Sequence, residues 1–159
     1  MKRKVLFLCT KNSARSQMAE AILNYRGGGN FIAYSAGSKP AKEIHPLALK
    51  VLIDAGFDMS GKMPKPMEGY LAEEFFFIIT LCDRMREECP VFPGKPILAH
   101  WGMPDPTTCE GTEGEQQKCF EQTLNDISER ISLFLSLPME KLDRMALELQ
   151  VKGIGKTSL

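Results

Sequence analysis

Short apolar runs alternate with amphipathic stretches along most of the chain. An apolar run that breaks off in polar or turn-forming residues is typical of a buried strand, whereas apolar residues spaced three or four positions apart are typical of a helix with one buried face. The pattern predicts strands over residues 4–9, 31–36, 75–82 and 96–100. It predicts helices between the first two strands and over residues 46–55, 83–88 and 113–135.

The alternation of strands and helices predicts an α/β fold in which a four-stranded parallel sheet is flanked by helices. In such sheets ligands bind beyond the carboxyl ends of the strands, at the point where the strand order reverses. Cys9 and Cys82 end the first and third predicted strands, and Asp105 follows the fourth. We therefore expect these three reactive side chains at one edge of the sheet.

The C-terminal part adds one more amphipathic stretch, which predicts a terminal helix over residues 139–150. Its apolar face, which we expect to pack on the domain, consists of Leu142, Met145, Ala146 and Leu149. The chain is therefore divided into a main domain over residues 1–137 and a helical extension with a tail over residues 138–159.

Composition narrows the classes of partner. The 159 residues carry 20 basic and 20 acidic side chains, so no excess of positive charge favours nucleic acid or an anionic membrane surface. The longest apolar run, Phe75 to Leu81, is too short to cross a bilayer, and the run at residues 5–9 is too short for a signal peptide. We expect a cytoplasmic protein that binds neither nucleic acid nor membranes.

Five cysteines, at positions 9, 82, 89, 109 and 119, bring redox chemistry and metal binding into question. An odd number without a secretion signal argues against structural disulfides. Zinc is disfavoured because there is no C-x-x-C motif and the only histidines are His45, expected at a helix start, and His100, expected at a strand end. We expect no metal and no organic cofactor, with Cys119 packed beneath the long helix and Cys109 in the loop near Asp105.

The stretch Cys9-Thr-Lys-Asn-Ser-Ala-Arg-Ser16 carries the most specific signal. A short loop between a strand and a helix can turn its backbone N–H groups inward, and the helix N-terminus adds partial positive charge. Arg15 supplies a planar fork that matches two oxygens of a tetrahedral oxyanion. Among these donors we expect Cys9 to be an ionised nucleophile, with Ser16 donating a hydrogen bond to its sulfur. The predicted oxyanion-binding residues are Thr10, Lys11, Asn12, Ser13, Ala14, Arg15 and Ser16.

Taken alone, these residues have plainer explanations. Cys9 would be a buried cysteine at a strand end and Arg15 an exposed helix residue. Their spacing between an apolar strand and an amphipathic helix favours the anion site instead. Asn12 suits a strained backbone position or a side chain that braces the loop.

The segment KVLFLCTKNSARSQMAEAIL resembles the phosphate-binding loop of the low-molecular-weight protein tyrosine phosphatases, and is still more similar to that of arsenate reductases with the same fold. The resemblance continues through YSAGSKP, HPLALKVLIDAGFDMSG, FIITLCDRMREECP and HWGMPDP, over most of residues 3–135. It implies a four-stranded parallel sheet flanked by helices, with Cys9 as nucleophile and Arg15 as anion ligand. It also implies that Asp105, in an Asp-Pro pair that alone would signal a turn, is the general acid.

Several positions separate the two groups. The phosphatases usually carry a cysteine at the position of Ala14, a proline at that of Gln17 and tyrosines after the Asp-Pro pair, where this chain has threonines. Arsenate reductases carry SQMAE, as here, and a cysteine pair that matches Cys82 and Cys89. Lys11 replaces a glycine common to both groups, and Ala14 also departs from a cysteine frequent in the reductases.

Cys82 and Cys89 flank the predicted helix over residues 83–88. Residues seven apart on one continuous helix lie about 10 Å apart by rise alone, so a disulfide between them requires local unwinding. The plainer alternative is two unrelated thiols, one in the core and one on a helix.

The resemblance implies reduction of arsenate to arsenite by a thiol relay. Cys9 attacks arsenic, Cys82 attacks the Cys9 sulfur, and Cys89 moves the disulfide to the surface, where thioredoxin, or alternatively glutaredoxin, reduces it. Two alternatives stay open. A phosphotyrosine phosphatase would use Cys9, Arg15 and Asp105 in the same way and leave the other two thiols unused. A noncatalytic sensor of oxyanions or thiol state would signal through a partner.

Overall fold

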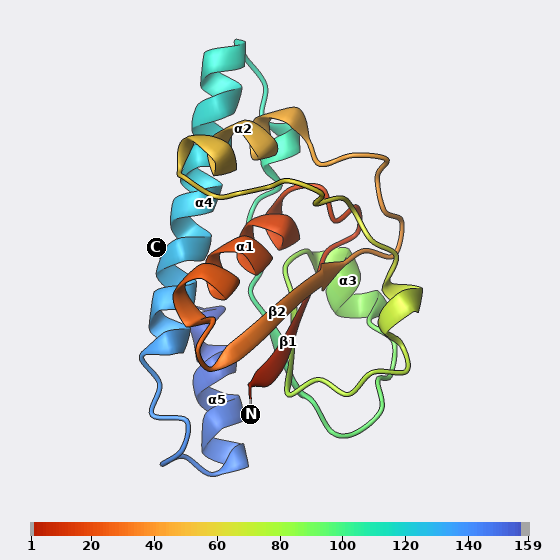
Figure 1. The fold of residues 1–159 in the computed structure, drawn as a ribbon, viewed down its shortest axis with the longest axis vertical. Coiled ribbons are helices and arrows are strands. Elements are labelled where there is room, and N and C mark those ends of the chain that lie inside the picture. Colours follow the sequence, from red (N-terminus) through yellow and green to blue (C-terminus); the bar gives the residue numbers. More distant parts are fainter. Residues whose placement is uncertain (1, 157–159) are drawn as a thin grey trace.

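The computed structural model describes residues 2–156 of the chain. Its four strands form one parallel sheet in the order β2-β1-β3-β4, and they are β1 (Arg3–Leu8), β2 (Phe31–Ala36), β3 (Phe77–Thr80) and β4 (Ile97–His100) (Figure 1). The α-helices are α1 (Arg15–Gly27), α2 (Pro46–Asp54), α3 (Asp83–Glu88), α4 (Glu113–Leu135) and α5 (Arg144–Ile154). Two short 3-10 helices lie at Met67–Tyr70 and Pro106–Thr108. The predicted fold class is confirmed.

The sheet separates two apolar layers of unequal size. Side chains alternate between the faces of a strand, so Phe7 and Phe77 pack in the larger layer with α1, α2, α4 and α5, whereas Leu6 and Ile78 pack in the smaller one with α3 (Figure 1). Both central strands are therefore buried on two faces. This explains why β1 and β3 read as continuous apolar runs instead of alternating ones.

The strand order determines where the candidate site lies on the sheet. The chain passes from β1 outward to β2 and then returns to the other side of β1 as β3, so the order reverses between β1 and β3. These two strands are in parallel register, with Leu8 beside Thr80. The segments that leave their carboxyl ends consequently start side by side, and one carries Cys9 while the other carries Cys82.

Element boundaries differ from the predictions by one or two residues in several places. The third strand spans Phe77–Thr80 instead of 75–82, although the Phe76 amide still donates to Lys4 and the Leu81 amide to Leu8. The first strand ends at Leu8, which leaves Cys9 as the first residue of the loop. The second helix ends at Asp54, one residue early, and the fourth strand begins at Ile97.

The prediction for the terminal helix was wrong in its boundaries. Helix α5 spans Arg144–Ile154 instead of 139–150, because the Asp143 carboxylate accepts a hydrogen bond from the Ala146 amide at 2.8 Å and caps the helix there. The last residues of the predicted tail, 157–159, lie outside the described part of the chain.

The shift also changes which face of the terminal helix is buried. Leu147, Val151 and Ile154 enter the larger apolar layer, so α5 shares the core of the main domain. Met145 and Leu149, which we predicted on the packed face, are 74% and 67% exposed. Within residues 2–156 no helix is long and apolar enough to span a membrane.

Two leucines two positions apart on α5 test this corrected face. Leu147→Ala removes a side chain that is 3% exposed and is expected to lower the free energy of unfolding by about 2–5 kcal/mol. Leu149→Ala, the matched control on the exposed face, is expected to change it by less than about 0.5 kcal/mol. Urea unfolding followed by circular dichroism measures both values, and equal losses in the two variants would contradict the placement of α5.

Candidate active site

The loop between β1 and α1 is fixed by the chain that follows β2. The carbonyl oxygens of Thr10, Lys11 and Ser13 accept hydrogen bonds of 2.9–3.0 Å from the amides of residues 39, 41 and 45. Gly37 makes the contact close enough, because a Cβ atom there would lie 2.4 Å from the Thr10 carbonyl oxygen. The loop carbonyls are thus turned toward this segment, which leaves the loop amides facing the other way.

Those amides are available to a ligand. Within residues 2–156, the backbone N–H groups of residues 11–16 donate to no protein acceptor. Four unpaired N–H groups are normal at a helix N-terminus, and here the loop before α1 adds further ones. Consecutive inward N–H groups at a helix N-terminus form a site for an anion of tetrahedral shape.

Asn12 holds the loop in this shape. Its φ of 49° is the only positive value at a non-glycine position among the described residues, and asparagine tolerates this conformation. The buried side chain accepts from the Lys65 amide at 2.9 Å and from Gln17 Nε2 at 3.0 Å, and donates to Ser16 Oγ at 2.7 Å. The structure therefore gives Asn12 both of the roles that its residue type suggests.

The Ser16 hydroxyl occupies a different place from the one predicted. It contacts Asn12 Nδ2 and has no hydrogen bond to the Cys9 sulfur. The Asn12 side chain lies inside the turn and donates its Nδ2 hydrogen bond to the Ser16 hydroxyl oxygen. Ser16 thus belongs to the bracing of the loop in this structure.

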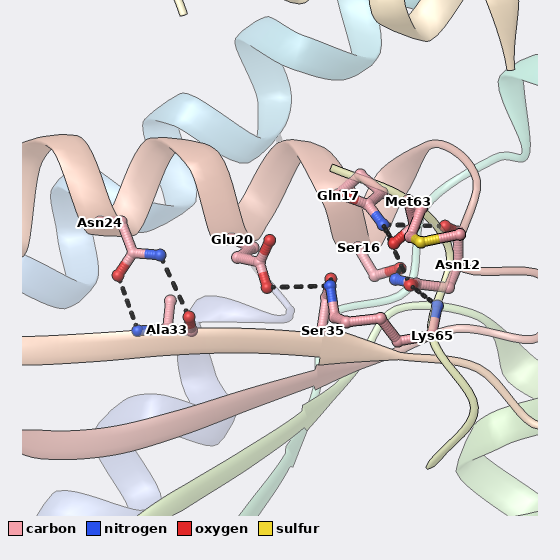
Figure 2. A network of polar contacts seen from close by, with 9 residues as sticks. All are labelled: Asn12, Ser16, Gln17, Glu20, Asn24, Ala33, Ser35, Met63 and Lys65. Carbon is pink, nitrogen blue, oxygen red and sulfur yellow. Dashed lines mark hydrogen bonds and ion pairs between the residues drawn. The ribbon is translucent and has the colours of Figure 1, made fainter. Parts of the chain in front are cut away.

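A partly buried ion pair lies between α1 and β2 beneath the loop (Figure 2). Lys65 Nζ is 3.3 Å from Glu20 Oε1 and 3.4 Å from Ser35 Oγ, and the Glu20 side chain is only 8% exposed. The backbone amide of the same lysine donates to Asn12, so Lys65 joins the loop, α1 and β2. Sequence reasoning missed Lys65 and Glu20 because they are 45 residues apart and share no motif.

The sulfurs of Cys9 and Cys82 are neighbours at the mouth of the loop. Both residues are buried, and Thr10 Oγ1 is 3.3 Å from Cys82 Sγ. A hydrogen bond from Cys9, followed by that of Thr10, lowers the pKa of Cys82 to about 5 despite burial. The contact with Cys82 and burial raise the pKa of Cys9, although Arg15 and the Thr10 amide lower it.

The prediction that Cys9 is the ionised thiol is therefore not met by this structure. The two sulfurs share one negative charge, because a second thiolate beside the first would meet strong repulsion. The contact lowers the pKa of Cys82 and raises that of Cys9, so we expect the charge to lie mainly on Cys82. The sequence offered no sign of this, since 72 residues separate Thr10 and its partner Cys82.

Arg15 and Asp105 meet beside the thiols, as their places in the sequence predict. Arg15 Nη2 is 3.6 Å from Asp105 Oδ2, and Nη1 donates to the carbonyls of Met103 at 3.0 Å and Leu81 at 3.4 Å. The arginine is 9% exposed. Burial raises the pKa of Asp105. Hydrogen bonds from Thr107 and the charges of Arg15 and Lys11 lower it by more than burial raises it, so the pKa lies below the ordinary value.

Cys82 and Cys89 cap opposite ends of α3. Both are free thiols, as is Cys9. Cys89 is half-buried, its Sγ donates to the Pro90 carbonyl at 3.6 Å, and burial raises its pKa. The helix between the two is intact over Asp83–Glu88, so a direct disulfide still requires this turn to open.

The prediction of no structural disulfide was wrong for the remaining pair. Cys109 and Cys119 form a disulfide that joins the loop after Asp105 to the first turns of α4. Cys119 lies far enough toward the exposed side of α4 to reach the loop, and so does not pack beneath the helix. The loop brings together two cysteines that the sequence places ten residues apart.

The two histidines have structural contacts. His45 caps α2, where its ring nitrogen accepts from the Leu47 amide. His100 ends β4 and contacts Thr80 at 2.8 Å and Asp83 at 3.1 Å. Across residues 2–156, no three side chains of His, Cys, Asp or Glu gather in a way that would hold a metal ion.

The four-stranded parallel sheet, the cysteine that follows β1 and the arginine that opens α1 define a phosphatase-like α/β domain, and the loop between β1 and α1 has its amides unpaired. The family model "Low molecular weight phosphotyrosine protein phosphatase" matches residues 4–147. The chain belongs to this family.

Similar proteins in the family include arsenate reductases. The chain is 37% identical to the arsenate reductase of Bacillus licheniformis over 133 residues, which cover 84% of this chain and 95% of that protein. It is 30% identical to the glutaredoxin arsenate reductase of a Synechocystis strain, over 81% of this chain and 93% of that one.

Solved structures give the same picture. A thioredoxin-dependent arsenate reductase of Corynebacterium glutamicum superposes with a TM-score of 0.62 at 33% identity, over 82% of this chain, which spans 61% of that longer chain. A low molecular weight protein tyrosine phosphatase from T. tengcongensis superposes with a TM-score of 0.65 at 24% identity, over 89% of this chain and all of that one, and shows the shared fold.

The pKa of Cys82 makes the position of the thiolate testable. Its ultraviolet absorbance is expected to titrate with a pKa of about 5 in the wild type and in Cys89→Ser, and at higher pH in Cys9→Ala, which removes the hydrogen bond that lowers the pKa most. Because the folded pKa lies below the unfolded one, this group's stabilisation is complete above the unfolded pKa and is lost as pH falls through about 5. A low-pKa thiolate that persists unchanged in Cys82→Ser would place the charge on Cys9.

Replacement of Lys65 tests the brace under the loop. Lys65→Met leaves the Glu20 carboxylate buried without its cation, so we expect a loss of about 1–3 kcal/mol in the free energy of unfolding and weaker binding of inorganic phosphate. Lys65→Arg should retain most of both, and Lys62→Met, at an exposed lysine nearby, serves as the matched control. Urea unfolding and isothermal titration with phosphate measure the two effects; phosphate affinity that is unchanged in Lys65→Met would refute the brace.

Proposed function

We propose that this protein is an arsenate reductase that works in the cytoplasm and passes electrons through Cys9, Cys82 and Cys89. The observation that carries the proposal is the contact between the Cys9 and Cys82 thiols at the mouth of an anion-binding loop, with a third free thiol at the other end of α3. Phosphate transfer needs one nucleophile, whereas reduction needs two electrons, which a pair of thiols supplies on forming a disulfide.

Binding begins at the loop. The amides of residues 11–16 donate hydrogen bonds to the oxygens of arsenate, and Arg15 turns part of its guanidinium from Asp105 toward the anion. Release from Arg15 and the approach of a second negative charge both raise the pKa of the Asp105 carboxyl. Asp105 then takes up the proton that it later donates, which reconciles its ionised state in the empty loop with the role of general acid.

In the first chemical step the Cys9 sulfur forms a bond to arsenic. Its proton passes to the adjacent Cys82 thiolate, so that the nucleophile is ionised only when it attacks. An arsenic–oxygen bond breaks at the same time, and Asp105 protonates the departing oxygen, which leaves as water. The product is a covalent adduct between Cys9 and arsenic(V).

Two exchanges of thiol and disulfide complete the reaction. Cys82 attacks the Cys9 sulfur, its proton passes to an oxygen of the adduct, and the electron pair of the sulfur–arsenic bond leaves with arsenic, which departs as arsenite. Cys89 then attacks Cys82, and the Cys9 thiol is released as the Cys82–Cys89 disulfide forms. This last step needs α3 to unwind, because the two cysteines cap its ends.

The electron donor that we propose is thioredoxin, with glutaredoxin as the alternative. The names of two similar proteins support these donors, one being a thioredoxin-dependent arsenate reductase and the other a glutaredoxin arsenate reductase. Cys89 is the more exposed of the three free thiols and so the one that a protein donor reaches first.

The proposal predicts a specific defect for Cys89→Ser. With thioredoxin, thioredoxin reductase and NADPH, the wild type should turn over arsenate repeatedly. The variant should release one equivalent of arsenite and stop with a Cys9–Cys82 disulfide, which peptide mass spectrometry detects. The Cys109→Ser/Cys119→Ser double variant is the matched control and should keep multiple turnover.

The same experiment separates the reductase from a phosphatase, the activity for which the family is named. A phosphatase that uses Cys9, Arg15 and Asp105 would hydrolyse an aryl phosphate at the same rate with or without Cys89, and would consume no NADPH with arsenate. Arsenate-dependent NADPH consumption that survives in Cys89→Ser would also defeat the relay.

A further inference from the structure

A cavity of about 740 Å³ lies next to Cys89 and apart from the anion loop. Its floor is the α3-facing side of the sheet, where Ile78 on β3 pairs with Leu98 on the edge strand β4. Leu98 is 48% exposed, whereas its partner Ile78 on the same face of the sheet is 1% exposed. No residue from Cys9 to Ser16 lines this space, and its volume falls in the range of small-molecule sites, roughly 300–1,000 Å³.

The rim of the cavity is mainly cationic. Arg86 comes from α3, and Lys152 and Lys156 come from the end of α5 on the other side. Arg86 and Lys156 have no ion-pair partner within residues 2–156, whereas Lys152 is 3.7 Å from Glu148. The one acidic residue in the lining, Asp83, is 3.1 Å from His100. Three basic side chains against one acidic one give the lining an excess of positive charge above an apolar floor.

The Cys89 thiol also lines this cavity. Cys89 follows the last turn of α3 and lines the cavity, while its relay partner Cys82 lies at the other end of that helix. Cys89 comes from the end of α3, whereas Lys152 and Lys156 lie in and just after α5, so the thiol and two of the cations belong to different elements of the lining. A molecule that fits both features carries a sulfur at one end and carboxylates at the other.

We propose that the cavity beside Cys89 binds anionic low-molecular-weight thiols and their disulfides, and aligns their sulfur with Cys89. The carboxylates contact Arg86, Lys152 or Lys156, and the carbon chain covers Leu98. Lys152, Lys156 and Leu98 lie outside α3, so their contacts do not depend on that helix when it unwinds to form the Cys82–Cys89 disulfide. In the reaction cycle, which rests on the proposed function, such a thiol is a second electron donor beside the protein donor.

The chemistry balances with two molecules of the small thiol. The thiolate of the first attacks Cys89 Sγ in the Cys82–Cys89 disulfide, which forms a mixed disulfide and releases Cys82 as a thiolate. The second attacks the sulfur of the bound small molecule, which frees Cys89 and gives the disulfide of the small thiol. The two small thiols lose two electrons and two protons, and Cys82 and Cys89 gain them.

The binding site can be tested without arsenate. In a variant with serine at positions 9, 82, 109 and 119, Cys89 is the only cysteine, and circular dichroism checks the fold. We would measure its rate of reaction with a dicarboxylate aryl disulfide and with neutral dipyridyl disulfide, where Cys89 displaces one aryl thiolate in each case. Cys89 should react faster with the anionic reagent than with the neutral one, and this difference in rate should decrease as the salt concentration is raised.

Charge reversal assigns the preference to the cavity. Arg86→Glu combined with Lys156→Glu should lower the ratio of anionic to neutral rates by about tenfold or more, since opposite charge becomes like charge. Lys118→Glu combined with Lys141→Glu, at exposed positions outside the lining, is the matched control and should leave the ratio within about twofold. An equal effect of both pairs, or no preference in the parent variant, overturns the proposal.

A second measurement addresses the role in turnover. Reduced glutathione, a tripeptide thiol with two carboxylates, should open the Cys82–Cys89 disulfide of the otherwise native protein faster than its diethyl ester does, and mass spectrometry should find the mixed disulfide on Cys89. Equal rates with acid and ester would refute the donor role. If arsenate is not reduced in any assay while the charge preference at Cys89 holds, the proposed function fails and the binding site stands.

Discussion

The contact between two sulfurs, Cys9 and Cys82, is the constraint on which the candidate site depends. It exists because β1 and β3 are adjacent and in register although more than 60 residues of chain lie between them, and both strands end at the same edge. Two thiols in contact cannot both be ionised, so the pair holds one proton and one charge. In the proposed mechanism, this arrangement keeps a base next to the nucleophile and the second electron donor within reach of the first.

The anion loop in turn depends on polar groups that lie beneath it. Asn12 joins the turn to Gln17 and to the chain at Lys65, and the Lys65 ammonium neutralises Glu20 between α1 and β2 (Figure 2). A buried carboxylate without a partner would be costly. Because the same lysine bonds the loop through its amide and the helix through its side chain, we expect a change at Lys65 to alter the positions of the loop amides.

Much of the fold could be predicted from the sequence because its signals are local. The apolar runs of β1 and β3 and the capped helix α4 lie within a few residues of the predicted bounds. The terminal helix was misplaced because the cap at Asp143 outweighs the apolar residues before it. Spacing alone was enough to place Cys9, Arg15 and Asp105 at one edge.

The rest of the site could not be read from the sequence because it arises from contacts across the chain. The charge on Cys82 depends on Cys9 and Thr10, which the sheet brings to it. The Lys65–Glu20 pair and the cavity beside Cys89 likewise combine segments that have no pattern in common. Such features become visible only when the strand order and the helix ends are known.

The bond between Cys109 and Cys119 has a consequence for counting thiols. Only Cys9, Cys82 and Cys89 are free in this structure, so a thiol reagent applied to the denatured, unreduced chain reports three groups and not five. A donor that also cleaves this bond spends an extra pair of electrons once, before steady turnover begins. The first round of reduction and all later rounds then differ in stoichiometry, although the chemistry at the loop is the same.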